Sequence, residues 1–243
     1  MMRTRNTAIF GLFVMALALS LPGRLPAASM GTSHGHDLDI LWAKAQRQYD
    51  LQAHDAILLL ESRHASILAN GNLKTCVHRV VWIGTDVGID HYADLRIPWD
   101  SAASALSVIA LRTWRDGTWW PHESNVSGTA VVETLPFALA QADDYTSMRE
   151  TMLLHDGIEL PCIMETIYEI EQKGAAIEGC DDLFVFPQDD PAVLVEYRLS
   201  VPAGAAPLYR AVNGAPEPDV ETGEDRAATY VWKMENVPPL GSP

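Results

Sequence analysis

Basic residues are scarce in this sequence. It holds 17 Lys and Arg against 32 Asp and Glu, a formal net charge of −15 at pH 7. A chain with that charge repels the phosphates of nucleic acids and the surfaces of anionic membranes. The acidic residues are scattered along the chain, so we interpret them as solvated surface rather than as an acidic binding tail. We expect no nucleic-acid partner.

Long apolar runs are also missing, since a run of about 20 such residues is needed to span a bilayer. The most apolar stretch, residues 8–19, is shorter; Arg3 and Arg5 precede it, and small residues follow at positions 27–29. That pattern is typical of a secretory signal peptide. We therefore predict a signal peptide over residues 1–28, a periplasmic or extracellular location, and no stable membrane insertion after cleavage. Cleavage removes three arginines, which leaves 14 basic against 32 acidic residues, a net charge of −18.

Only three cysteines occur, Cys76, Cys162 and Cys180. An exported chain can form disulfides, and Cys162 and Cys180 flank a strand pattern with the turn residues 173–174 behind it. A hairpin there would bring the two thiols together. We predict a disulfide between Cys162 and Cys180, and we expect Cys76 to be a buried, inert thiol.

Motifs of known catalytic sites are absent: there is no Gly-rich phosphate loop, and no His-Glu-x-x-His sequence. Cys76 and His78 are two residues apart on one predicted strand face, where a thiol and a base could meet. Cys76 falls in mid-strand, however, and not at a helix N-terminus, where the helix dipole lowers a thiol pKa. We predict no catalytic residue and no enzyme activity.

The densest group of potential metal ligands is His34 and His36 with Asp37 and Asp39. Imidazole and carboxylate both suit zinc, copper or nickel. Residues 29–36 are rich in Gly, Ser and Thr, which predicts an unstructured N-terminus and argues against a closed site. We therefore expect no metal and no cofactor; the alternative is a small metalloenzyme that uses His34 and His36.

Alternation of apolar and polar residues dominates the remaining chain and predicts strands with one solvated face. It is clearest from Val193 to Val201; further strands are predicted over residues 57–68, 73–83, 94–99, 106–114, 148–154, 164–171, 183–186, 208–212 and 229–234. Asn70-Gly71 is a hairpin signal between two of them. Asp37 is expected to cap one short helix. We predict an all-β fold, a β-sandwich or stacked antiparallel sheets, with a short N-terminal helix.

Aromatic residues make up 8% of the chain, yet four of the seven tryptophans lie around the predicted turn 115–118. Exposed aromatic side chains on a β-scaffold can stack on sugar rings or hold a peptide. We predict Trp119 and Trp120 as ligand-binding residues; the alternative is that they pack in the core. Because neighbouring strand residues point to opposite faces, one of the two is expected to be exposed and the other buried.

Several segments, taken in order, resemble the bacterial domain of unknown function numbered 3857 over residues 50–240. They are Arg96-Ile97-Pro98-Trp99, Arg112 to Gly117, Tyr197 to Pro202, Tyr209 to Gly214 and Tyr230 to Pro238. The resemblance implies an all-β accessory domain without catalytic residues, similar to the N-terminal β-domain of M1-type zinc aminopeptidases. It also implies a usual place in front of a transglutaminase-like domain in exported proteins, and this chain ends where such a domain would begin.

We predict four segments: the signal peptide (1–28), an N-terminal segment with the short helix (29–53), the β-sandwich domain (54–237) and a linker-like tail (238–243). The predicted function is that of an exported, non-catalytic binding or scaffolding module for a peptide, glycan or protein partner. The alternative is the accessory N-terminal half of a transglutaminase-like cysteine peptidase system whose catalytic domain is absent from this chain or encoded separately.

Overall fold

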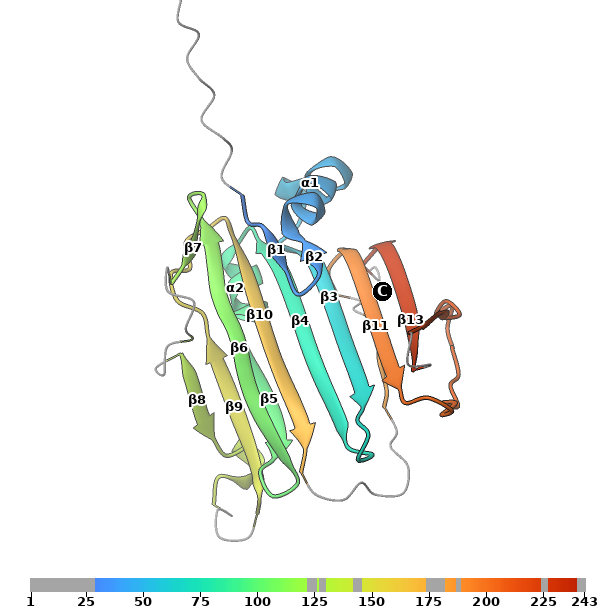
Figure 1. The fold of residues 1–243 in the computed structure, drawn as a ribbon. Helices are drawn as coiled ribbons and strands as arrows, with labels where there is room; N and C mark the ends of the chain where they lie inside the picture. The colour runs from blue at the N-terminus through green and yellow to red at the C-terminus, as the bar shows by residue number, and fades with distance from the viewer. Residues whose placement is uncertain are drawn as a thin grey trace, which may run out of the picture.

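The structure is a computed structural model that describes residues 29–121, 126, 130–141, 146–173, 182–186, 189–223 and 227–239. Its main feature is an eight-stranded sheet with the strand order β12-β13-β11-β3-β4-β10-β6-β7 (Figure 1). In chain order these strands are β3 (Ala56–Ile67), β4 (Leu73–Ile83), β6 (Ser104–Arg115), β7 (Thr118–Trp120), β10 (Cys162–Gln172), β11 (Ala192–Val201), β12 (Asp219–Thr222) and β13 (Ala228–Val237). Neighbouring strands run antiparallel except β11 and β3, which are parallel.

A second sheet, in the order β5-β9-β8, stacks on one face of the large sheet. Its strands are β5 (Asp94–Asp100), β8 (Val131–Thr134) and β9 (Met148–Leu154). Ile97 of β5 and Leu153 of β9 form an apolar core with Leu111 of β6. The helix α2 (Asp86–Tyr92) packs on the same face, beside Val81 and Ile83. The stacked all-β architecture predicted from the alternation is confirmed, with one parallel strand pair in it.

The other face of the large sheet carries a small hairpin, β1 (Thr32–Ser33) and β2 (His36–Asp37), followed directly by α1 (Leu38–Gln48) (Figure 1). We call it the hairpin face. As predicted, Asp37 caps the helix: its Oδ1 accepts from the backbone N–H of Ile40 at 3.0 Å. Leu38, Leu41 and Ala45, spaced by three and four residues, are the buried side of α1. The helix therefore covers one end of the hairpin face and leaves the other end open.

The prediction of a hairpin after β10 is wrong. β10 lies between β4 and β6, while the next strand, β11, pairs with β3 and β13. Both edges of β10 are thus taken by strands from earlier in the chain, and no edge is left for a returning strand. The 70–72 turn between β3 and β4 and the 115–118 turn between β6 and β7 do connect hairpins as predicted.

Two segments predicted as strands, residues 183–186 and 208–212, pair with no strand. Their aromatic side chains attach them to the sheet instead: Phe184 stacks on Tyr197 at 5.2 Å between ring centroids, and Tyr209 lies edge-on to Trp232 at 5.4 Å. In both segments, aromatic rings pack on the sheet while the backbone forms no strand pair. The elements α2, β1, β2, β8 and β12 were not predicted.

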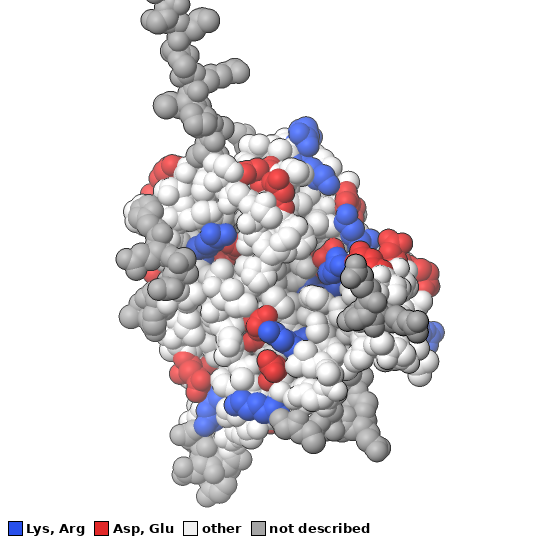
Figure 2. All heavy atoms as spheres, viewed as in Figure 1, with Lys and Arg blue, Asp and Glu red and all other residues white. Residues whose placement is uncertain are grey.

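The surface carries charges of both signs. Figure 2 shows Lys and Arg interspersed with Asp and Glu on the face that bears the hairpin. Among the described residues, no helix has the length and apolar character needed to cross a membrane. The signal peptide predicted over residues 1–28 lies outside the described ranges, and it stays a prediction.

Candidate functional site

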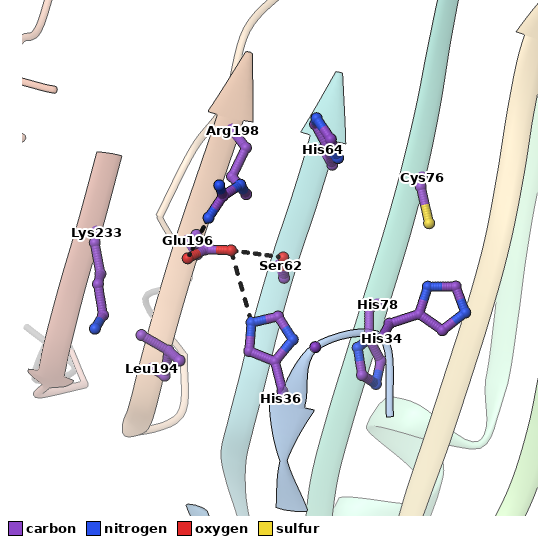
Figure 3. A pocket seen from close by; sticks show the side chains of 11 residues that line it. His34, His36, Ser62, His64, Cys76, His78, Leu194, Glu196, Arg198 and Lys233 are labelled. Atoms are coloured by element: carbon purple, nitrogen blue, oxygen red, sulfur yellow. Dashed lines mark hydrogen bonds and ion pairs between the residues drawn. The ribbon is translucent and has the colours of Figure 1, made fainter. Parts of the chain in front are cut away.

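A pocket of about 410 Å³ opens on the hairpin face, where the turn of the β1-β2 hairpin lies over β3 and β4 (Figure 3). Side chains two apart on a strand share a face, so alternate residues of the neighbouring strands reach it. We call it the histidine pocket, after four of its lining residues. The full lining is His34, Gly35 and His36 of the hairpin, Ser62 and His64 of β3, Cys76 and His78 of β4, Leu194, Glu196 and Arg198 of β11, and Lys233 of β13.

The hairpin that closes one side of the pocket is held by its own residues and by α1. Its turn, His34-Gly35, has φ of 44° and 83°, the two positive values of a type I′ turn. The Asp39 carboxylate accepts from the backbone N–H groups of Met30 at 2.9 Å and Gly31 at 3.1 Å. The prediction that residues 29–36 are unstructured is therefore wrong. The Asp39 carboxylate, in the first turn of α1, thus accepts hydrogen bonds from backbone N–H groups of the segment that precedes the helix.

The two aspartates weighed as metal ligands have other partners. Asp37 caps α1 and Asp39 binds the backbone before the hairpin. His34 and His36 instead turn toward His78, with ring centroids 5.8 and 5.6 Å from its own. In the described part of the chain, no three His, Cys, Asp or Glu side chains are already placed around one ion.

Glu165 of β10 lies under the hairpin and is 0% exposed. Its Oε1 accepts from His78 Nε2 at 2.9 Å, and its Oε2 accepts from Arg112 Nε. Burial alone would raise the pKa of this carboxyl group, but hydrogen bonds from His78, Arg112 and Ser33 outweigh it and lower the pKa to about 2. The interpretation of Glu165 as a solvated surface residue is wrong, because the hairpin covers the face on which it lies.

Glu196 is a second buried carboxylate at the pocket, 7% exposed. Its Oε1 accepts from Ser62 Oγ at 3.4 Å and faces His36 Nε2 at 3.6 Å, while Arg198 Nη1 is 3.6 Å from Oε2. Burial raises the pKa of Glu196, but His36, Arg198 and Ser62 together lower it below its usual value. The pocket therefore presents an ionised carboxylate beside a guanidinium.

Cys76 is half-buried at the open end of the pocket, directly across from His64 in the β3-β4 register. Burial raises the pKa of its thiol, so the thiol is protonated at neutral pH. His64 Nε2 is engaged elsewhere, 2.8 Å from Ser200 Oγ. Within the described residues, no hydrogen bond links Cys76 to a histidine. A base within hydrogen-bond reach, which a thiol nucleophile needs, is not in place.

Trp119, a predicted ligand-binding residue, is half-buried and supports the Glu165 network from the side. The Arg112 guanidinium lies over its ring at 4.0 Å, and the indole N–H donates to the carbonyl of Met30 at 3.2 Å. Trp114 packs edge-on to it at 5.3 Å. Its contacts are thus with the chain itself, and its role toward a ligand stays a prediction.

Trp120 is also half-buried, with the Arg115 guanidinium 4.6 Å from its ring centroid. Gly157 lies so close that a Cβ there would be 3.0 Å from the Cβ of Trp120. The expectation that one of Trp119 and Trp120 is exposed and the other buried is wrong, since stacked arginines cover both in part. The structure does not bring either tryptophan into the histidine pocket.

Cys162 is buried at the start of β10, where burial raises its pKa to about 11. No disulfide joins the two described cysteines, Cys76 and Cys162. Cys180, the predicted partner of Cys162, lies outside the described residues, and the hairpin invoked to bring it near does not form. The bridge stays a prediction.

Alkylation of the intact protein without reductant tests that bridge. If Cys162 and Cys180 are joined, the mass should rise by one blocked thiol, that of Cys76. Such a bridge stabilises a chain by roughly 3 kcal/mol. Unfolding the protein in denaturant during alkylation gives buried thiols access to the reagent, and three blocked thiols under that condition would show that the bridge is absent.

The residues that build the pocket were only partly found from the sequence. The sequence points to His34, His36, Cys76 and His78, whereas it predicts surface charges at Glu196 and at Glu165, which lies under the hairpin. A usable signal was present, because Ser62 and His64 on β3, and Glu196 and Arg198 on β11, repeat polar side chains at period two. The pattern does not show, however, which of these polar strand faces lie next to each other, because that depends on the order of the strands in the sheet.

Comparisons with solved structures find a candidate protease of Parabacteroides distasonis, with a TM-score of 0.68, 23% sequence identity and 77% of this chain covered. This chain spans 36% of the length of that protein, and the match shows a shared fold. Other matches are a two-domain M1 zinc metallopeptidase (14% identity, 74% of this chain, 39% of that chain, TM-score 0.32) and aminopeptidase A of Legionella pneumophila (11% identity, 79% of this chain, 22% of that chain, TM-score 0.33).

A comparison with curated proteins finds no match. A family model does match: a domain of unknown function with a solved structure, DUF3857, over residues 69–240. The matched range begins just before β4 and reaches past the end of β13, so it includes most of the large sheet and all of the small one. It agrees with the resemblance found in the sequence. The chain therefore belongs to the DUF3857 family.

Proposed function

We propose that this domain is a non-catalytic binding module of an exported protein, and that the histidine pocket receives a peptide segment of a partner. The observation that carries the proposal is the pocket itself, a hollow in a polar sheet face lined by hydrogen-bonding side chains of both charges. Concave sites with a few convergent polar groups are the usual places for ligands.

The charged groups of the pocket are held in position before any ligand arrives. Arg198 lies between two carboxylates, with Nη1 3.6 Å from Glu196 and Nη2 donating to Glu221 at 2.8 Å. Lys233 Nζ is 2.9 Å from Glu235. Side chains already fixed lose less conformational entropy on binding than free ones do, which favours affinity.

The mixture of groups favours a peptide over the other ligand classes. A carboxylate, a guanidinium, an ammonium group and several imidazoles together match the amides and the charged ends or side chains of a peptide. A polyanion would meet the repulsion of a chain with a net charge of −15. Among the lining residues there is no Trp, Tyr or Phe to provide a stacking surface for a sugar ring.

Among the described residues that line the pocket, no nucleophile is activated, which supports a binding role over catalysis. The Cys76 thiol is the strongest nucleophile among the residues that line the pocket, and burial raises the pKa of this thiol instead of lowering it. The hydroxyls of Ser66 and Ser200 do contact His64 Nε2, at 3.3 and 2.8 Å. No carboxylate is hydrogen-bonded to His64 among the described residues, so nothing orients it as a base.

Replacing Lys233 with alanine is expected to weaken peptide binding and to leave stability nearly unchanged. Lys233 lines the pocket, and its ion pair with Glu235 is exposed, a kind of pair worth about 0–1 kcal/mol. Retention of peptides from a random hexapeptide library on the immobilised protein, read by mass spectrometry, measures the effect. Thermal unfolding checks that the variant is folded.

Lys44→Ala is the matched control. Lys44, on α1, pairs with the same Glu235 at 3.3 Å but does not line the pocket. Its loss removes an equivalent exposed ion pair and should leave peptide retention as it is. Equal retention by the unaltered protein and Lys233→Ala, or no retained peptide at all, would contradict the proposal.

The second candidate is the accessory half of a transglutaminase-like cysteine peptidase system. The observation in its favour is the likeness to a candidate protease of which this chain covers 36%. The coding region after Pro243 distinguishes the two: an in-frame domain with catalytic Cys, His and Asp residues would favour the accessory role. Peptide hydrolysis by this chain, abolished by Cys76→Ala, would instead contradict both.

A further inference from the structure

We propose that His36 and His78 bind a divalent transition-metal ion, such as Zn²⁺ or Cu²⁺, through their Nδ1 atoms, at the wall of the histidine pocket. The proposal does not depend on peptide binding. It rests on the carboxylates that face the two imidazoles, on the lack of hydrogen-bond partners at their Nδ1 atoms among the described residues, and on the distance between the two rings.

Each of the two rings has a carboxylate at its Nε2 atom. His78 Nε2 is 2.9 Å from Glu165 Oε1, and His36 Nε2 is 3.6 Å from Glu196 Oε1. Because an ionised carboxylate only accepts hydrogen bonds, His78 Nε2 carries the proton. His36 Nε2 lies just beyond hydrogen-bond distance of Glu196, whose negative charge favours the proton on that nitrogen. The opposite nitrogen, Nδ1, then presents a lone pair. Histidines that bind metals usually have this arrangement, with one nitrogen on the ion and the other donating to a carboxylate.

Both Nδ1 atoms are buried. In the described part of the structure, neither His36 Nδ1 nor His78 Nδ1 has a hydrogen-bond partner. Leaving a buried polar atom unpaired costs about 1–3 kcal/mol, and most such atoms in proteins are paired. Two of them lie on adjacent imidazoles, on residues brought together from the hairpin and from β4. A metal ion would pair both at once.

The rings are close to the spacing that a shared ion requires. Their centroids are 5.6 Å apart, with the planes inclined by 67°. With metal–nitrogen bonds of about 2.0–2.1 Å, two imidazoles on one tetrahedral ion have centroids about 5 Å apart. Figure 3 shows His34, His36 and His78 gathered where the hairpin turn lies over β4. A shift of the hairpin by a fraction of an ångström would bring the His36 ring to that distance.

The site would have two protein ligands and open positions toward the pocket. Among the described residues, no third His, Cys, Asp or Glu is already placed to bind the same ion. His34, at the exposed hairpin turn and 5.8 Å from His78 between centroids, is the nearest imidazole that could add itself. Water or a pocket ligand would fill what remains. The ion would also fasten the hairpin to β4, since it joins a residue of each.

The test is a Zn²⁺ titration of the full chain, produced without a polyhistidine tag and freed of metal by a chelator that is then removed. Calorimetry should show one Zn²⁺ bound per chain. Long-range ¹H–¹⁵N spectra of the unaltered protein should show the Nδ1 signals of His36 and His78 shifting on addition of Zn²⁺ while their Nε2 atoms keep their protons. This readout needs no variant, so it holds even where a substitution of buried His78 prevents folding.

Two single variants separate this site from the rest of the pocket. His36→Ala should bind Zn²⁺ about tenfold or more weakly, the loss expected for a damaged metal site. His64→Ala removes a histidine that lines the same pocket but is bonded to Ser200, and it should bind as the unaltered chain does. The proposal is overturned if the unaltered chain binds no stoichiometric Zn²⁺, if His36→Ala binds equally well, or if the Nδ1 signals do not move.

Discussion

Replacing Arg112 with methionine is expected to lower the free energy of unfolding by about 3 kcal/mol. Arg112 donates to Glu165, a carboxylate that is 0% exposed and whose pKa of about 2 shows it to be ionised in the folded state. Methionine keeps most of the side-chain volume but removes the charge, so a buried anion keeps only its bonds to His78 and Ser33. Urea unfolding followed by tryptophan fluorescence measures the loss.

Arg96→Met is the matched control for this prediction. Arg96 also donates to a carboxylate, that of Glu150 at 2.9 Å, but its side chain is 53% exposed. Solvent-exposed pairs contribute about 0–1 kcal/mol, so this variant should unfold near the midpoint of the unaltered protein. If Arg112→Met is as stable as Arg96→Met, the hydrogen bonds around Glu165 are not what holds the hairpin face together.

Replacing Leu60 with alanine is expected to destabilise the protein by about 3–4 kcal/mol. Leu60 is fully buried on β3, in the core between the sheet and α1 that also includes Leu41 and Val80. The substitution removes three carbon atoms and leaves a cavity that a core made of strands on one side and a helix on the other cannot fully close. A shift of the urea midpoint at constant slope measures it.

Leu208→Ala makes the same chemical change on the surface. Leu208 is fully exposed, in a segment that the alternation predicted to be a strand. A leucine in water contributes little to packing, so this variant should match the unaltered protein within about 0.5 kcal/mol. A large loss at Leu208, comparable to that at Leu60, would mean that residues 208–212 pack as the strand that the sequence predicted.

Local structure in this chain follows from local sequence. Alternation from Val193 to Val201 predicts β11, and Asn70-Gly71 predicts the turn between β3 and β4. Asp37 before Leu38 predicts the start of α1. Each of these depends on contacts within about a dozen residues, between side chains and the backbone that carries them. Period-two and period-3.6 patterns and capping residues report such contacts directly.

The pocket depends on contacts over long stretches of chain. His36 and Glu196 are 160 positions apart in the numbering, and they meet because β11 pairs with β3 in parallel while the hairpin folds back over both. Alternation says which side chains share a face of a strand, but it does not say which strands are neighbours or what covers them. Glu165 looks like any solvated glutamate in the sequence for that reason.

By itself, the sequence determined the all-β class, most strands of the two sheets, the cap of α1 and membership of a known family, because those depend on patterns read along a short length of chain. Only the tertiary structure decided that β10 lies between β4 and β6, that the N-terminal hairpin covers Glu165, and that the ring centroids of His36 and His78 lie 5.6 Å apart. Strand order and coverage set burial, and burial decides whether a polar side chain is surface or site.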